Sequence, residues 1–137
     1  MDDTELWRRF AEQGLEHSEW NHRLHLRTAA LHLQRYDFDE AHLRLRAGII
    51  RLNQRHGLEE SAQRGYAETL TRVWLHLVAH AIKTSAPPAA SSNELLERHP
   101  ELLDRGLTLR HYSKSVLVSS RARAIYVEPD LAPLPAF

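Results

Sequence analysis

The chain has 137 residues, a length that fits one domain with its own hydrophobic core. It contains no Cys, which excludes disulfides, thiolate catalysis and Cys-ligated zinc or iron–sulfur sites. The 18 Lys and Arg balance 18 Asp and Glu, whereas binding to nucleic acid or an anionic membrane needs a basic surplus. No apolar stretch is long enough for a membrane span, and the acidic N-terminus lacks a signal-peptide pattern. We therefore expect a cytoplasmic protein that binds neither nucleic acid nor membrane.

Helical periodicity and capping residues dominate the first two thirds of the chain. Asp3 or Thr4 can cap a first helix, and Gly14 is a natural residue to end it. Ser18 can cap a second helix that continues to about Tyr36. Two helices with a short connection are therefore expected before the next capping signal.

Two longer helices are expected next. The sequence Asp37-Phe38-Asp39-Glu40 has the form of a capping box and opens a third helix, which Gly57 ends. Ser61 can open a fourth and longest helix that continues to about Thr84. Residues 85–92, with two adjacent Pro and several Ser, then interrupt regular structure and are predicted to form a loop.

The C-terminal third is expected to contain only short elements. In chain order these are a helix over 93–99 stopped by Pro100, a turn around 102–105, a short strand over 116–118, and a helix over 121–126 capped by Ser119 or Ser120. The Pro-containing tail at 128–135 should be extended and pack along the helices through its Leu residues. We predict a single all-α domain over 1–137: an up-down four-helix bundle at 1–84, the loop at 85–92 and a C-terminal wrap at 93–137.

Two His residues in the second predicted helix are candidate metal ligands. His22 lies within an apolar stripe, and His25 lies one turn later at its edge, so both imidazoles share one helical face. Glu19 precedes His22 by three residues, the Glu-x-x-His spacing of di-iron carboxylate bundles, although that pattern needs two copies and only one occurs. The alternative is that the imidazoles are buried and hydrogen-bonded to backbone carbonyls or acids.

A third candidate ligand lies in the fourth predicted helix, which is apolar almost all round and should be central. Glu68 falls on an apolar side of it, and a buried carboxylate must be paired, coordinated or protonated. With His22 and His25 it would form a two-His, one-carboxylate set that suits Fe, Mn or Zn. Glu19, Tyr66 and Thr69 would then orient the ligands from outside. The alternative for Glu68 is a surface salt bridge to Arg72 or Arg64.

Other His pairs compete with this set. His76 and His80 are four residues apart, the tightest chelating spacing on a helix, but they lack the Glu of an HExxH motif. His42 and His56 share a flank of the third predicted helix with Ile49. Half-exposed His residues on a helix rim explain these spacings without a metal.

Several segments together resemble a family of small bacterial all-helical proteins of uncharacterised function. The segments are Trp20-Asn21-His22-Arg23-Leu24-His25-Leu26, residues 41–49 ending in Leu-Arg-Ala-Gly-Ile, Asn53 with His56-Gly57, Tyr66-Ala67-Glu68-Thr69-Leu70-Thr71 and the tail over 127–135. The shared pattern is aromatic-x-His-x-x-His-Leu followed by Tyr-x-Glu-Thr-x-Thr. The resemblance implies a helical fold and places His22, His25, Glu68, Thr69 and Thr71 on the motif. Many members carry a second His where this chain has Ala67, so a site that used that His would be altered here.

These observations support a small metal-binding protein, with redox or oxygen chemistry as the enzymatic form of the hypothesis. The alternative is a non-enzymatic helical module with an apolar groove for a small molecule or a partner helix, which a homo-oligomer could also use. A third hypothesis is an assembly that responds to pH, because ten His would make a neutral chain strongly positive on mild acidification.

Overall fold

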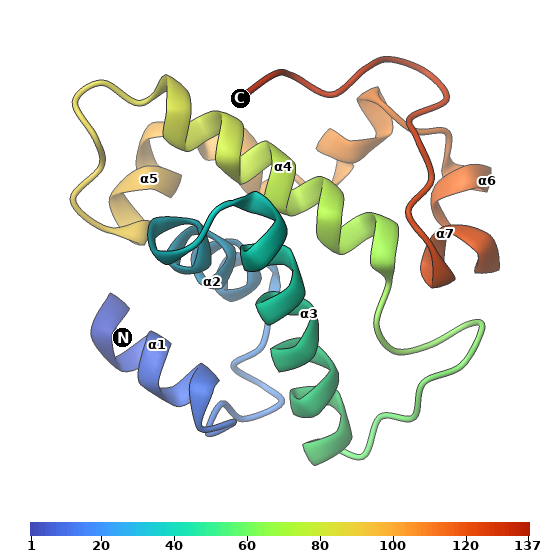
Figure 1. Ribbon diagram of the computed structural model, residues 1–137, viewed down its shortest axis with the longest axis horizontal. Coiled ribbons are helices and arrows are strands. Elements are labelled where there is room, and N and C mark those ends of the chain that lie inside the picture. Colours follow the sequence, from blue (N-terminus) through green and yellow to red (C-terminus); the bar gives the residue numbers. More distant parts are fainter.

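The computed structural model describes all 137 residues, and it is all-helical with no strand (Figure 1). Its elements in chain order are α1 (Asp3–Ala11), α2 (His22–Arg35), α3 (Phe38–Arg55), α4 (Glu68–Thr84), α5 (Ser92–Arg98), the 3₁₀ helices η1 (Pro100–Leu103) and η2 (Arg105–Arg110), α6 (Lys114–Leu117) and α7 (Ser120–Ala124). The all-α prediction is confirmed. The strand predicted over 116–118 is wrong, because Ser113 caps a helical turn there by accepting from the Val116 amide.

The core forms where α2, α3 and α4 pack on one another, and α2 also contacts α1 and α5. Each of the three central helices contributes a fully buried Leu to this core: Leu26 from α2, Leu45 from α3 and Leu75 from α4. Burying a side chain of this size contributes about 1.5–3 kcal/mol, so each of these Leu residues stabilises the contact among the three helices. In Figure 1 these helices run in clearly different directions. The up-down four-helix bundle therefore stays a prediction.

Two of the four long helices begin later than expected. Asn21, rather than Ser18, caps α2 by accepting from the Leu24 amide at 2.9 Å. Ser61 accepts amide hydrogen bonds in a short turn and opens no helix. Gly65 has a φ of +96°, a left-handed conformation that interrupts a helix, so α4 starts only at Glu68.

Of the other predicted helix boundaries, those of α3 are confirmed and those of α1 differ. Asp37 caps α3 by accepting from the Glu40 amide, and Gly57 ends it with a φ of +75°, as predicted. Asp2, rather than Asp3 or Thr4, caps α1. At its end, Gln13 takes the left-handed conformation expected at Gly14, with a φ of +57°.

Polar contacts attach the terminal segments to the central helices. The buried Arg27 of α2 donates to Ser92 Oγ of α5 at 2.8 Å and to Asp3 of α1 at 3.2 Å. The tail returns along α4 (Figure 1), where Pro135 and Ala136 carbonyls accept from histidines. The chain ends are thereby held against α2 and α4.

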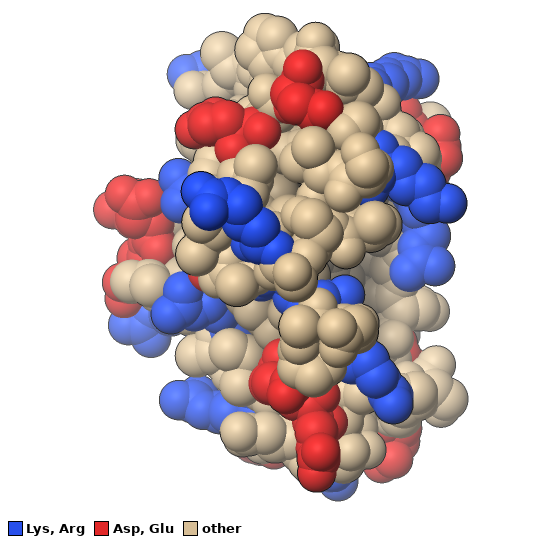
Figure 2. All heavy atoms as spheres, turned by 90° about the vertical axis from the view of Figure 1, so that its right-hand side faces the viewer, with Lys and Arg blue, Asp and Glu red and all other residues tan.

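Charges of both signs are distributed over the surface. Figure 2 shows Lys and Arg interleaved with Asp and Glu on the side that carries α6 and α7, without a large area of one sign. Such a surface offers no extended electrostatic footprint on this side. None of the helices combines the length and the apolar character needed to cross a membrane.

Candidate functional site

A cavity of about 360 Å³ lies where α2, α3 and the start of α4 meet, and we call it the imidazole pocket. Its lining comprises Trp20, Asn21, His22, His25, Ile49, Asn53, Leu58, Gly65, Tyr66, Ala67, Leu70, Thr71, Trp74 and Arg105. The volume lies within the range of small-molecule sites, which combine apolar walls with a few convergent polar groups. Both His residues of the first sequence motif therefore face one cavity, together with Tyr66, Ala67 and Thr71 of the second.

The first of these imidazoles is oriented by a backbone contact. His22 Nε2 donates to the Leu102 carbonyl of η1 at 2.9 Å, and its ring lies 4.5 Å from the Trp74 ring between centroids. With the proton on Nε2, Nδ1 carries the free lone pair. Burial lowers the pKa of His22, partly offset by the Leu102 bond and aided by the nearby Arg105 charge. His22 is therefore a neutral imidazole with one unused acceptor.

The second imidazole has no hydrogen-bond partner in the protein. His25 contacts the Trp20 ring edge to face at 5.7 Å between centroids. Burial, reinforced by the neighbouring His22, lowers the pKa of His25 to about 4, so its ring is neutral at pH 7. Every fully enclosed side-chain nitrogen and oxygen of the protein is bonded, so the free nitrogens of His25 reach the cavity.

Two further polar side chains on the cavity wall are also unpaired. Asn53 of α3 is only 8% exposed, and its side-chain amide makes no hydrogen bond within the protein. Arg105 of η2 is exposed and forms no ion pair. No Asp or Glu lines the cavity, so the Arg105 guanidinium gives it a positive electrostatic character.

Glu68 does not face the two histidines and is fully engaged elsewhere. Its Oε1 accepts from His42 Nε2 at 2.6 Å and from the Tyr66 hydroxyl at 2.9 Å, and its Oε2 accepts from Arg46 at 2.9 Å. Burial alone would raise the pKa of Glu68, but these donors outweigh it and hold the pKa below its usual value. The suggested salt bridge to Arg72 or Arg64 is also absent. Glu68 is an ionised structural carboxylate that ties α3 to α4.

The other predicted supporting residues divide between the cavity and the scaffold. Tyr66 lines the imidazole pocket, and its hydroxyl proton is committed to Glu68. Thr69 instead donates to the Ile125 carbonyl and accepts from the Val127 amide, so it secures the tail. Glu19 precedes α2 rather than lying on it and forms a two-bond ion pair with Arg9, at 2.6 and 2.9 Å. The helical Glu-x-x-His geometry is therefore not formed.

The other histidines considered as candidate ligands, His56, His76 and His80, bind backbone carbonyls. His76 Nε2 donates to the Pro135 carbonyl at 2.7 Å, and His80 Nδ1 donates to the Ala136 carbonyl at 2.6 Å. His56 Nε2 donates to the Leu15 carbonyl at 2.9 Å. The His76–His80 pair thus fixes the tail to α4.

The protein brings no three His, Asp or Glu side chains into one metal-ligating group. The set of His22, His25 and Glu68 fails this test because α4 begins at Glu68, where the side chain meets α3 instead of the cavity. Sequence reasoning overlooked Asn53 and Arg105 as cavity residues. Sequence reasoning also did not pair His42 with Glu68, although a buried carboxylate needs a positively charged or hydrogen-bonding partner.

Comparison with protein-family models, curated proteins and solved structures finds no match to this chain. The resemblance to a bacterial helical family stays a prediction. The candidate site therefore stands on its own geometry.

Proposed function

We propose that this chain binds a small organic acid in the imidazole pocket. The observation that supports this most is the convergence of three polar side chains without protein partners, His25, Asn53 and Arg105, on one cavity. A ligand that bonds to these groups gains polar contacts that no protein side chain already occupies.

The chemistry of the wall specifies the class of ligand. Arg105 supplies a guanidinium for a carboxylate, which it can bind through two parallel hydrogen bonds. His25 and Asn53 supply further donors and acceptors deeper in the wall, whereas Ile49 and Leu70 supply apolar contact. The ligand is therefore a compact acid whose body carries at least one hydrogen-bonding group.

The test is a ligand-observed NMR screen of small carboxylic acids, each paired with its neutral primary amide. We expect acids to bind in preference to their amides, and Arg105→Gln to abolish that preference. Arg110→Gln is the matched control, because Arg110 is an exposed arginine of η2 that does not line the cavity. Binding of acids and amides alike, or equal loss in both variants, would contradict the proposal.

A transition metal held by His22 and His25 is the second candidate, and one contact favours it. A metal-binding His usually donates its other ring N–H to a carbonyl or carboxylate, as His22 does to Leu102. Against it, the only charged group on the wall is a cation, Arg105. Titration with Fe(II), Mn(II) and Zn(II) separates the candidates: stoichiometric binding lost in His25→Ala would favour the metal.

A further inference from the structure

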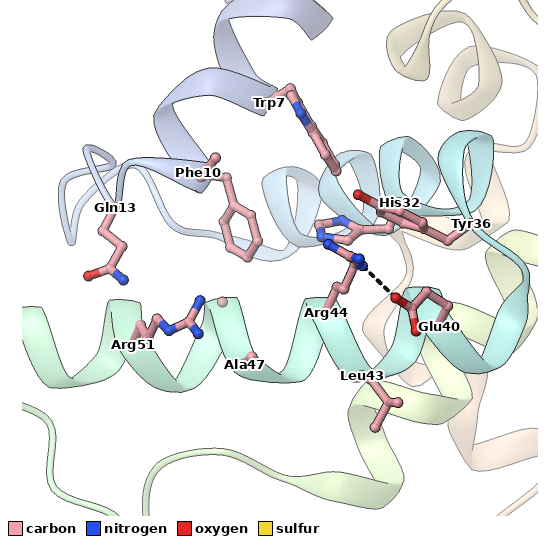
Figure 3. Close-up of a pocket in the computed structure, with 12 residues that line it drawn as sticks. Trp7, Phe10, Gln13, His32, Tyr36, Glu40, Leu43, Arg44, Ala47 and Arg51 are labelled. Carbon is pink, nitrogen blue, oxygen red and sulfur yellow. Dashed lines mark hydrogen bonds and ion pairs between the residues drawn. The ribbon is translucent and has the colours of Figure 1, made fainter.

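A second and larger cavity, of about 490 Å³, opens between α1, α2 and α3, and we call it the aromatic groove (Figure 3). Trp7 and Phe10 enter it from α1, His32 enters it from α2, and Tyr36 enters it directly after the end of α2. The groove is separate from the imidazole pocket, because the two cavities share no lining residue.

The floor of the aromatic groove is made of small residues of α3. Ala47 and Gly48 face the aromatic side chains, and a Cβ at Gly48 would lie only 2.4 Å from Phe10 Cζ. A helical Gly costs about 1 kcal/mol relative to Ala, so its use here matches the close approach of Phe10. At these two positions the floor carries no side chain larger than a methyl group.

His32 presents a fixed acceptor to the groove. Its Nδ1 donates to the Thr28 carbonyl at 2.7 Å, which leaves the Nε2 lone pair without a protein partner. Burial lowers the pKa of His32, partly offset by that bond, so the imidazole is neutral at pH 7. A ligand O–H or N–H group can donate to Nε2.

Three Arg side chains lie around the groove, and one of them, Arg51, has no partner in the protein. Arg44 is paired with Glu40 at 2.8 Å and lies over the Tyr36 ring, while Arg35 lies over the Trp7 ring. Arg51 forms no ion pair or hydrogen bond, and Figure 3 shows its guanidinium reaching into the groove from α3. An anionic group therefore has an unoccupied partner at this end.

We propose that the aromatic groove binds an aromatic acid, with its ring among Trp7, Phe10 and Tyr36, its carboxylate on Arg51, and a ring hydroxyl or N–H on His32 Nε2. Aromatic rings pack favourably edge to face and offset, so a ligand ring in the groove can contact the aromatic side chains that line it. The unpaired Arg51 cation at one end of the groove and the free Nε2 acceptor of His32 define this ligand class.

The test uses 4-hydroxyphenylacetate as the probe, with heteronuclear NMR to locate and quantify its binding. We expect shifts confined to α1, the end of α2 and the middle of α3. Phenylacetate, which lacks the hydroxyl, and 4-hydroxyphenethyl alcohol, which lacks the charge, should each bind at least fivefold more weakly. Arg51→Gln should weaken the probe at least tenfold, since hydrogen bonds to charged groups are the strong ones.

Arg55→Gln is the matched control, because Arg55 is an exposed, unpaired arginine of the same helix outside the groove. It should leave the affinity unchanged. Equal affinity for the acid and the alcohol, shifts centred on the imidazole pocket, or an Arg51→Gln variant that binds like the native protein would each overturn the proposal. Because Arg105→Gln tests the imidazole pocket alone, the two proposals can fail separately.

Discussion

His25 is a polar side chain that lines the imidazole pocket and has no hydrogen-bond partner in the protein. Its imidazole is neutral at pH 7 and partly exposed, whereas one turn earlier His22 Nε2 donates to the Leu102 carbonyl. A side chain selected for stability alone would be apolar at this place. The free nitrogens of His25 are therefore best understood as ligand contacts.

Replacing His25 by Leu tests this interpretation. The variant removes an unpaired polar group and adds apolar contact with Trp20, so the free energy of unfolding at pH 7 should rise by about 1 kcal/mol. Urea unfolding measures this change, and the NMR screen should show loss of acid binding in the same variant. A variant that is less stable than the native protein would show that His25 has a structural role.

Unlike His25, Glu68 has hydrogen-bond partners in the protein for both of its carboxylate oxygens. Glu68→Gln places an amide nitrogen opposite one of its donors, so the free energy of unfolding should fall by about 2 kcal/mol. Glu97→Gln is the control, because Glu97 is an exposed carboxylate without partners. A loss in Glu68→Gln no larger than in the control would contradict the role assigned to the network.

At the scale of elements, the junction of α1 with α3 depends on the absence of a side chain. Gly48 allows the Phe10 ring to lie against the α3 backbone, where Phe10 also packs on Trp20 at 5.7 Å and on His32 at 5.5 Å between centroids. The ring is thus held on several sides and has little freedom to move away. This contact sets the width of the aromatic groove.

Gly48→Ala should therefore destabilise the protein by about 1–3 kcal/mol, although the same change in an open helix stabilises it by about 1 kcal/mol. The reason is the overlap of the new Cβ with Phe10. Thermal unfolding followed by circular dichroism provides the measurement. An increase in the melting temperature would mean that Phe10 moves at little cost.

The start of α4 shows which parts of the fold the sequence can and cannot predict. The Asp37 cap and the end at Gly57 follow from local rules, and the structure has both. Ser61 also satisfies a local capping rule, yet Gly65 in a left-handed conformation delays the helix to Glu68. Local sequence rules cannot tell whether this helix begins after Ser61 or at Glu68, because tertiary packing selects the start.

The candidate site, like the start of α4, could be predicted from the sequence only in part. His22 and His25 share a face because their spacing requires it, and the cavity contains both. Glu68 could not be placed, because its orientation depends on the start of α4 and on His42 from another helix. Asn53 belongs to a segment of the family resemblance but is not among its motif residues, and Arg105 belongs to no motif; only the tertiary structure brings them to the cavity.

At the scale of the whole molecule, several buried histidines should make the protein sensitive to acid. The unfolded chain takes up a proton on His25 near pH 6.5, whereas burial and the nearby His22 delay this in the folded protein to about pH 4. Burial lowers the pKa of His22, His32 and His76 as well. Because the unfolded state binds more protons, stability falls as the pH drops from about 6.5 toward 4.

Between pH 7 and pH 5, His25 alone should reduce the free energy of unfolding by about 2 kcal/mol. Urea unfolding at both values measures the loss, and His25→Leu should lack this part of it. A native protein as stable at pH 5 as at pH 7 would show that these imidazoles already bind protons in the folded state.

The most direct measurement is the ring ¹⁵N spectrum of His25, recorded without ligand and at saturation with an acid identified by the NMR screen. We predict signals of a neutral imidazole at pH 7 that shift strongly on binding, while the signals of His76 and His80, which hold the tail, do not move. A bound acid that leaves the His25 signals unchanged would contradict the assignment of this cavity as the functional site.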